Sequence, residues 1–182
     1  MEKERLLLAV VVVAILIGAI VVLKEPSITG FVPSTVYSQD ITLQVDESQI
    51  FWLKSVDGQP LKLTSLLISG LVEGEGLASI YLYTPNDSRL LVYSNLKKKT
   101  SAMAPITGMA TKELLVVPGE RTQSIEVVPP DHDVVSGPFE AVCLETCILS
   151  PDVFDKSRYK MEIIVTPGTV INIKELRFTV EE

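Results

Sequence analysis

The chain has 182 residues, 47% of them hydrophobic, and its 16 basic and 23 acidic residues give a net charge of −7. Such an acidic chain repels the phosphate backbone of nucleic acids, so nucleic acid is excluded as an expected partner. The length allows one sizeable hydrophobic core and is short for two separate domains.

Residues 6–23 form an uninterrupted apolar run, LLLAVVVVAILIGAIVVL, after the charged sequence MEKER. A helix of this length spans roughly 27 Å, which is enough to cross the hydrocarbon core of a bilayer. A cleaved secretory signal is the alternative, but its apolar region is usually about 7–15 residues long and ends at an Ala-x-Ala-like site. No such site follows the run, so we expect an uncleaved transmembrane helix.

Positive charge predicts the orientation of this helix. Lys3 and Arg5 precede the run, and after Lys24 no Lys or Arg occurs before Lys54. By the positive-inside rule, residues 1–5 stay in the cytoplasm and the chain beyond the helix is extracytoplasmic. We therefore expect a single-pass protein of the cell membrane.

The extracytoplasmic part is expected to consist of a stalk and one domain. Residues 24–38 are rich in Pro, Ser, Thr and Gly without any periodicity, which is typical of a linker. Residues 39–182 then form the predicted domain.

Short strands account for most of this domain. Apolar and polar residues alternate with period two in three segments, 41–45, 159–165 and 175–181. Further short apolar runs occur at 49–55, 61–72, 77–84, 89–94, 113–117 and 123–129. Turn signals such as Asp57-Gly58 and Pro167-Gly168 separate them, and no helical periodicity appears between them. We predict an all-β domain built as an antiparallel β-sandwich of the jelly-roll type, and not a parallel α/β fold.

The C-terminal sequence GTVINIKELRFTVEE, residues 168–182, resembles the closing strands of galactose-binding-like jelly rolls, which include many carbohydrate-binding modules. This resemblance implies a jelly roll and carries over no ligand-binding residue. The apolar run followed by SITGF, residues 27–31, is similar to the opening of small anchored surface proteins of archaea.

Cys143 and Cys147, in FEAVCLETCILS, are the two cysteines of the chain. Their spacing is similar to the Cys-x-Glu-x-Cys-x3-His-x2-Met motif of the dinuclear copper domain of cytochrome oxidase, but Pro151 and Phe154 occupy the His and Met positions. A structural zinc site needs four Cys or His ligands, and His132 is the only histidine. A reactive dithiol needs a neighbour that lowers a thiol pKa, and Glu145 would raise it.

The remaining interpretation of the cysteine pair is a structural disulfide, because extracytoplasmic thiols oxidise. Residues four apart on a straight strand lie about 13 Å apart, whereas a disulfide needs Cα atoms about 4.4–6.8 Å apart. We therefore expect the strand that contains Phe139 to end near Cys143 and the chain to turn at 144–146.

Aromatic residues on the predicted strands are candidates for a sugar-stacking platform, with core packing as the alternative. These candidates are Trp52, Tyr81, Tyr83 and Tyr93. A neighbouring signal is Asn86-Asp87-Ser88, an acceptor triplet for N-glycosylation in a turn after Pro85.

Calcium is the one metal that remains a candidate, and no other cofactor is expected. The residues that could donate oxygen ligands are Asp131, Asp133, Asp152 and Asp155. Turn chemistry explains these aspartates equally well. A further unassigned segment is the loop 97–112, which begins with three lysines and is expected to be mobile or to contact an anionic partner.

Catalysis is not expected. With one histidine and no Gly-x-Ser-x-Gly element, a serine or cysteine triad is hard to build. The sequence instead favours a non-enzymatic binding or scaffolding role for a surface protein or glycan. The alternatives are a carbohydrate-binding module with an aromatic platform, and a metalloprotein or glycan-active enzyme.

The membrane topology can be tested with protease added to intact cells. We expect the protease to remove the bulk of the chain, because the positive charges hold only residues 1–5 inside. Full protection of the C-terminal part would reverse the predicted orientation.

Overall fold

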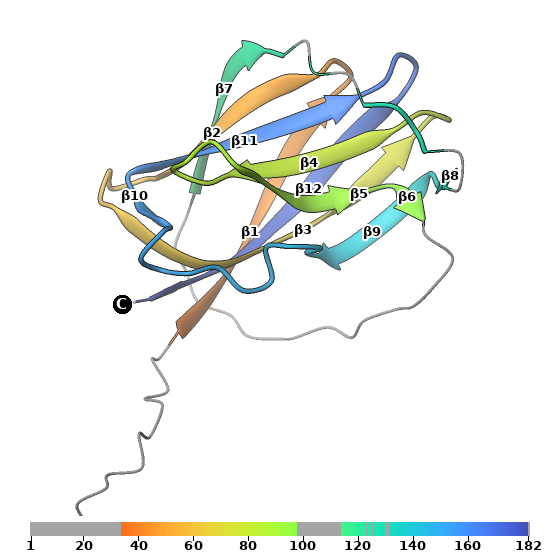
Figure 1. Ribbon diagram of the computed structural model, residues 1–182. Coiled ribbons are helices and arrows are strands. Elements are labelled where there is room, and N and C mark those ends of the chain that lie inside the picture. The colour runs from red at the N-terminus through yellow and green to blue at the C-terminus, as the bar shows by residue number, and fades with distance from the viewer. Residues whose placement is uncertain (1–33, 98–113, 123, 125, 130–131, 182) are drawn as a thin grey trace, which may run out of the picture. The chain divides into compact units, whose positions relative to one another are not determined.

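The computed structural model describes residues 34–97, 114–122, 124, 126–129 and 132–181. The predicted transmembrane helix, residues 6–23, and all but the first residue of the loop 97–112 lie outside the described residues. The described residues form twelve strands and no helix, and every strand pair is antiparallel (Figure 1). The prediction of an all-β antiparallel domain is confirmed.

Sheet A is built around the neighbouring strands β12 and β3. Among the described residues it contains, in order, β1 (Ser34–Val45), β12 (Val170–Glu181) and β3 (Leu61–Glu73), with β10 (Asp155–Lys156) and β9 (Gly137–Val142) both paired to the far side of β3. One register shift between Ile173 and Glu175 of β12 marks a β-bulge. After this bulge the alternation restarts, so that Leu176 points inward as Ile173 does.

Sheet B places β11 at its centre. Among the described residues it contains, in order, β5 (Arg89–Ser94), β4 (Ala78–Tyr83), β11 (Arg158–Val165), β2 (Gln49–Ser55) and β7 (Leu114–Arg121). A separate short pair joins β6 (Leu96–Lys97) to β8 (Asp133–Val134). The order of the strands brings β2 and β11, which are far apart in sequence, into direct register.

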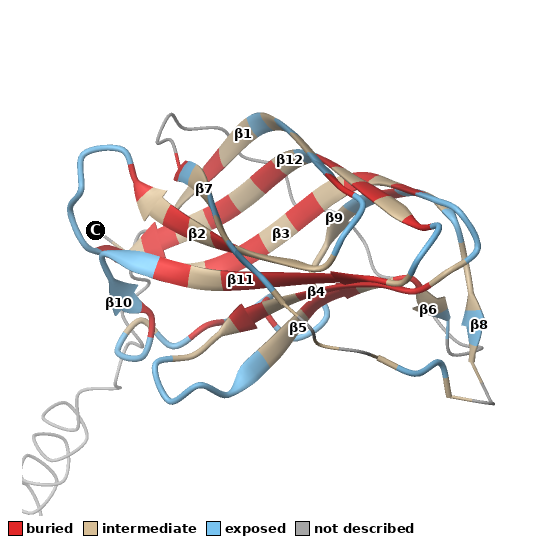
Figure 2. Cartoon of the chain, turned by 90° about the horizontal axis from the view of Figure 1, so that it is seen from above, coloured by how far each residue is buried: buried red, intermediate tan, exposed pale blue. Residues whose placement is uncertain are grey.

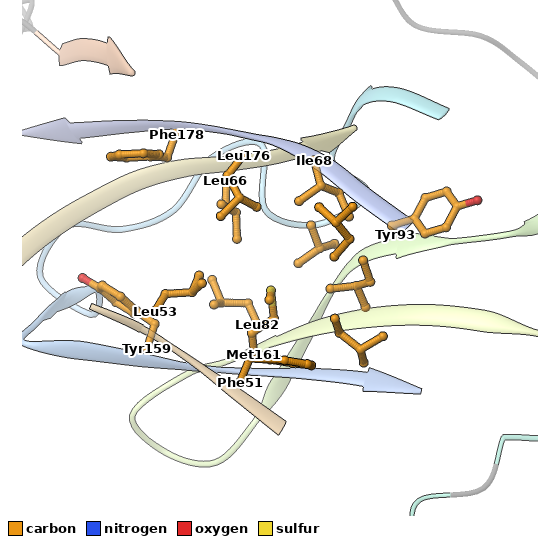
Figure 3. Packing of buried hydrophobic residues seen from close by; sticks show 14 of the residues in the cluster. Phe51, Leu53, Leu66, Ile68, Leu82, Tyr93, Tyr159, Met161, Leu176 and Phe178 are labelled. Atoms are coloured by element: carbon orange, nitrogen blue, oxygen red, sulfur yellow. The ribbon is translucent and has the colours of Figure 1, made fainter. Parts of the chain in front are cut away.

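The two sheets bury one face each against a common core. Figure 2 shows buried and less buried residues alternating along the strands, which is the period-two pattern of a sheet with one covered face. Figure 3 shows side chains of both sheets meeting in this core: Leu66, Ile68, Leu176 and Phe178 from sheet A, and Phe51, Leu53, Leu82 and Met161 from sheet B. Burial of these side chains is the main favourable contribution to folding.

Two sequence-based boundaries need correction. Strand β1 begins at Ser34, which pairs with Glu181, so residues 34–38 belong to the sheet and not to the stalk 24–38. Tyr37, within this segment, is buried and stacks on Phe178 with ring centroids 5.3 Å apart. The apolar run 123–129 is not a strand at the positions described, 124 and 126–129.

One open side of the sandwich is closed by a side-chain amide. Gln39 of β1 donates from Nε2 to the Leu114 carbonyl of β7 at 2.9 Å and accepts the Leu114 N–H at 2.6 Å. The amide group thus pairs with the strand as a backbone unit would, and it joins sheet A to sheet B at this side.

The opposite side is closed by the loop that contains the two cysteines. Leu144 N–H donates to the Val92 carbonyl of β5 at 3.0 Å, and Leu66 N–H of β3 donates to the Thr146 carbonyl at 3.1 Å. The loop therefore satisfies edge groups of both sheets at once. Thr146 is fully buried there, and its hydroxyl donates to the Leu66 carbonyl at 2.7 Å.

A disulfide joins Cys143 to Cys147, as predicted, with 5.2 Å between their Cα atoms. Strand β9 ends at Val142, and the chain bends at Leu144 and Glu145, which is the local geometry that the bridge requires. The disulfide thus fixes the bend that closes this side of the sandwich.

We expect loss of the disulfide to destabilise the domain without unfolding it. Reduction, or replacement of both cysteines by Ser, should lower the free energy of unfolding by about 1–2 kcal/mol and the melting temperature by roughly 2–8 °C. Thermal denaturation followed by circular dichroism measures this shift, and reductant should not lower the melting temperature of the double Ser variant further. Two free thiols in the freshly isolated protein would contradict the bridge.

Candidate functional site

The outer face of sheet B gathers three of the four predicted platform residues. Trp52 of β2 and Tyr81 and Tyr83 of β4 point away from the core, since the residues that alternate with them along these strands are buried. Tyr93 does not belong to this group and is corrected: it is 6% exposed and stacks on Phe139 in the core, with ring centroids 4.0 Å apart. Three aromatic rings thus share one sheet face.

A basic group lies over each of these rings. Arg158 lies 4.5 Å from the Trp52 ring centroid and Lys160 lies 4.0 Å from that of Tyr83. The guanidinium of Arg89 lies 4.3 Å from the centre of the Tyr81 ring. Cation–π attraction holds these basic groups against the sheet, so the ring faces are covered by positive charge and do not form a bare apolar platform.

Trp52 is further held by the neighbouring strand β7. Gly119 of this strand lies so close to β2 that an added Cβ would stand 2.9 Å from the Ile50 carbonyl oxygen and 3.1 Å from Trp52 Nε1. The absence of a side chain at Gly119 lets β7 pack beside the indole.

Glu162, at the centre of this face, is 2% exposed. A buried carboxylate is costly unless its oxygens accept hydrogen bonds. Three hydroxyls donate to it at 2.7 Å each: Tyr83 to Oε2, and Thr122 and Ser124 to Oε1. Arg89 adds a more distant ion pair at 3.9 Å.

The segment that follows β7 is tied to sheet B through these contacts. Besides Thr122 and Ser124, Glu126 accepts a hydrogen bond from the Tyr81 hydroxyl and forms an ion pair with Arg89 at 3.5 Å. The segment therefore crosses the outer face over β11 and β4 and covers Glu162. The part of the face formed by β2 and the start of β11 is not covered by this segment, because Arg158 remains exposed.

The same contacts shift the acidity of the groups involved. Burial alone raises the pKa of the Glu162 carboxyl, but the three hydroxyl donors and the Arg89 charge together hold this pKa below its ordinary value of 4.5. Burial and the hydrogen bond to Glu162 raise the pKa of Tyr83 to about 12. Glu162 is therefore ionised and Tyr83 is a neutral donor at physiological pH.

The alternation along β11 places Glu162 on the outer face of the sheet, but it does not reveal that this side chain is buried. The period-two pattern assigns a side chain to a face and cannot reveal that another segment covers this face. The signal that points to the cover is Thr122 and Ser124, because hydroxyls two residues apart lie on the same side of an extended chain.

An open pocket of about 810 Å³ adjoins the covered end of this face. Its walls come from the turn between β1 and β2, from the segment after β7 and from the end of β11: Asp46, Glu47, Ser48, Arg121, Thr122, Ser124, Glu126, Ile164, Val165, Thr166 and Pro167. Its size is in the range of ligand pockets, and its walls carry carboxylates and hydroxyls within a mostly apolar lining. Arg121 forms an ion pair with Glu47 at 2.7 Å.

The three calcium candidates that the structure describes belong to no group of metal ligands. Asp133 lies on β8, Asp152 in a turn and Asp155 on β10, all exposed, and Asp131 lies outside the described residues. Within the described part of the chain, no group of three or more His, Cys, Asp or Glu residues is positioned to hold a metal ion.

Asn86 lies in the exposed turn between β4 and β5. The turn is closed by a hydrogen bond from Thr84 N–H to the Ser88 carbonyl at 2.8 Å, and Asp87 adopts a left-handed conformation with φ of 57°. This places the predicted glycosylation triplet where a modifying enzyme can reach it.

The comparisons with known proteins do not place the chain in a family. The chain was compared with models of protein families, with curated proteins and with solved structures, and no match was found in any of the three. In the ranges that the structure describes, no helix is long and apolar enough to cross a membrane.

Replacement Glu162→Gln should destabilise the domain and flatten its stability profile at acid pH. The amide has one oxygen acceptor in place of two, and it forms no ion pair with Arg89. We therefore expect the free energy of unfolding to fall by about 1–3 kcal/mol. Because the folded-state pKa of Glu162 is below the unfolded value, its contribution is present above about pH 4.5 and is lost as the pH falls through the lowered pKa.

Urea denaturation at several pH values between neutral and strongly acidic measures both effects. The control is Glu47→Gln, which removes a 61% exposed carboxylate and should change the profile little. An equal acid dependence of stability in the wild type and in Glu162→Gln would contradict the role of this carboxylate.

Proposed function

We propose that the protein is a single-pass, membrane-anchored extracytoplasmic binding protein without enzymatic activity, whose β-sandwich recognises a surface ligand on the outer face of sheet B. The N-terminus lies in the cytoplasm, residues 6–23 cross the membrane, and the β domain lies outside the cell.

The location outside the cell is supported by the disulfide. Structural disulfides form and persist in extracytoplasmic compartments and are rare in the cytosol. The Cys143–Cys147 bridge closes one side of the sandwich, so the fold itself benefits from an oxidising environment.

A jelly roll is supported by the strand order. The order β1-β12-β3-β9 in one sheet and β2-β11-β4-β5 in the other is the arrangement of two interleaved Greek keys. Strand β7 is then an addition at the edge of sheet B, beside β2. Ligand-binding jelly rolls place recognition on a sheet face or in the loops, and here the polar and aromatic groups gather on sheet B.

The observation that carries the binding role is the contrast between the two outer faces. On sheet A, Arg177 pairs with Glu175, and serine hydroxyls of Ser38 and Ser69 complete the hydrogen bonds of this carboxylate. On sheet B, the outer face holds three aromatic rings and basic groups. Partly exposed aromatic rings with basic side chains over them, gathered on one face, are typical of recognition surfaces.

The alternative of a carbohydrate-binding module is favoured by the shared face of Trp52, Tyr81 and Tyr83. A glycan-active enzyme is disfavoured by Glu162, because its carboxylate is buried and its oxygens are engaged by three hydroxyls of the chain itself. A reacting carboxylate has to reach the substrate.

The test compares binding by variants of the two faces. Full-length protein is applied to a panel of purified cell-envelope glycans and envelope proteins, in the wild type, in Trp52→Ala and in Thr64→Ala, which changes a half-buried hydroxyl of sheet A. We expect Trp52→Ala to weaken binding at least tenfold, Thr64→Ala to bind as the wild type does, and the bound ligand to be recovered unchanged. Loss of binding only in the sheet A variant, or chemical conversion of the ligand, would contradict the proposal.

A further inference from the structure

Two basic residues face each other directly on the uncovered part of sheet B. In the register of β11 with β2, Arg158 pairs with Lys54 and Lys160 pairs with Trp52. These three basic side chains point outward, since the residues between them, Leu53 and Tyr159, are buried. Like charges directly opposite each other on neighbouring strands destabilise a sheet.

None of the described carboxylates forms an ion pair with these three basic residues. The ion pairs of the described basic residues join Arg89, Arg121 and Arg177 to acidic partners. Lys54, Arg158 and Lys160 form none within the described ranges, although the chain carries more acidic than basic residues. In a chain with a net charge of −7, three neighbouring basic residues without an ion pair to a described acidic residue are a local exception.

Cation–π contacts hold two of these groups in place before any ligand binds. Arg158 is held over Trp52 and Lys160 over Tyr83, at 4.5 and 4.0 Å from the ring centroids. Preorganised cations lose less conformational entropy when they bind an anion than free surface side chains do. The arrangement therefore offers fixed positive charges beside an indole ring.

From this geometry we infer that Lys54, Arg158 and Lys160, together with Trp52, form a binding site for the carboxylate groups of an acidic glycan. This inference rests on the proposed function and names its ligand class. The guanidinium of Arg158, stacked on the Trp52 indole, binds a carboxylate in bidentate fashion through its N–H groups, and Trp52 positions this guanidinium. The separation of Arg158 from Lys160 along the strand, about 7 Å, allows a second contact on the neighbouring sugar.

A glycan suits this surface better than an acidic peptide. Strand β2 lies between β11 and β7, and β11 lies between β4 and β2, so their backbone groups are already paired within the sheet. An extended peptide on this face would find no backbone partners for its own N–H and C=O groups. Sugar hydroxyls that point to water have no such requirement.

Long-range repulsion by the acidic domain does not prevent this binding. The Debye length is about 8 Å at physiological ionic strength, so the contacts at this site are governed by the nearest charges. A glycan with one carboxylate per sugar also carries charge at lower density than a nucleic acid duplex does.

Trp52 provides a direct reporter for the test, because it is the single tryptophan of the chain. Full-length protein in non-ionic detergent is titrated with oligogalacturonate while tryptophan fluorescence is recorded. The matched probes are the methyl ester of the same oligosaccharide, which lacks the charge, and oligoglutamate, which lacks the sugar. The variants are Arg158→Gln, Arg158→Glu and Lys156→Gln, the last being an exposed lysine of β10 in sheet A.

We expect oligogalacturonate to change the fluorescence saturably and to bind at least tenfold more tightly than either matched probe. Arg158→Gln should weaken this binding at least tenfold, and Lys156→Gln should not. Arg158→Glu should abolish the binding without lowering the melting temperature, because it sets an opposite charge against Lys54. Loss of binding with an unchanged melting temperature would show that Arg158 contacts the ligand and is not needed for folding.

Three results would overturn the inference. Equal binding of the methyl ester would leave a glycan-binding protein that does not recognise charge. Equal binding of oligoglutamate would show a general affinity for polyanions. The absence of a response to all probes would reject an acidic-glycan site at Trp52. The proposed binding function would still be tested separately, by the binding of the Trp52→Ala and Thr64→Ala variants to the envelope panel.

Discussion

A buried carboxylate organises the outer face of sheet B. Glu162 lies at the centre of the middle strand and is 2% exposed, so its charge requires hydrogen bonds from the protein itself. The three hydroxyl donors and Arg89 meet this requirement, and in doing so they draw the segment after β7 across the sheet. The face is thereby divided into a covered part around Glu162 and an open part around Trp52.

The two parts differ in how their charges are balanced. In the covered part, Arg89 has two acidic partners, Glu126 and Glu162. In the open part, Arg158 and Lys160 rest on aromatic rings, and Arg158 faces Lys54 across the strands. Like charges in register are unfavourable for a sheet, and this unfavourable pair is the observation on which we base the proposal that the open part binds an anionic ligand.

The sequence predicted what depends on local pattern. Alternation around Tyr159–Val165 and Leu176–Val180 identified the inward side chains, and the spacing of Cys143 and Cys147 predicted a bend with a disulfide. Features that depend on distant partners were missed. Local composition places Ser34 in the stalk, whereas its pairing with Glu181 depends on the other end of the chain. Likewise, only the stacking partner Phe139 distinguishes Tyr93 from a surface aromatic.

We propose the open part of sheet B as the recognition surface. Nuclear magnetic resonance of the full-length protein, labelled with 15N, tests it directly through the indole Nε1–H signal of Trp52 and the guanidinium Nε–H signals of Arg158 and Arg177. On addition of oligogalacturonate, we expect the Trp52 and Arg158 signals to move saturably and the Arg177 signal of sheet A to stay in place. Unchanged Trp52 and Arg158 signals, with shifts confined to sheet A or to the pocket beside Asp46, would contradict it.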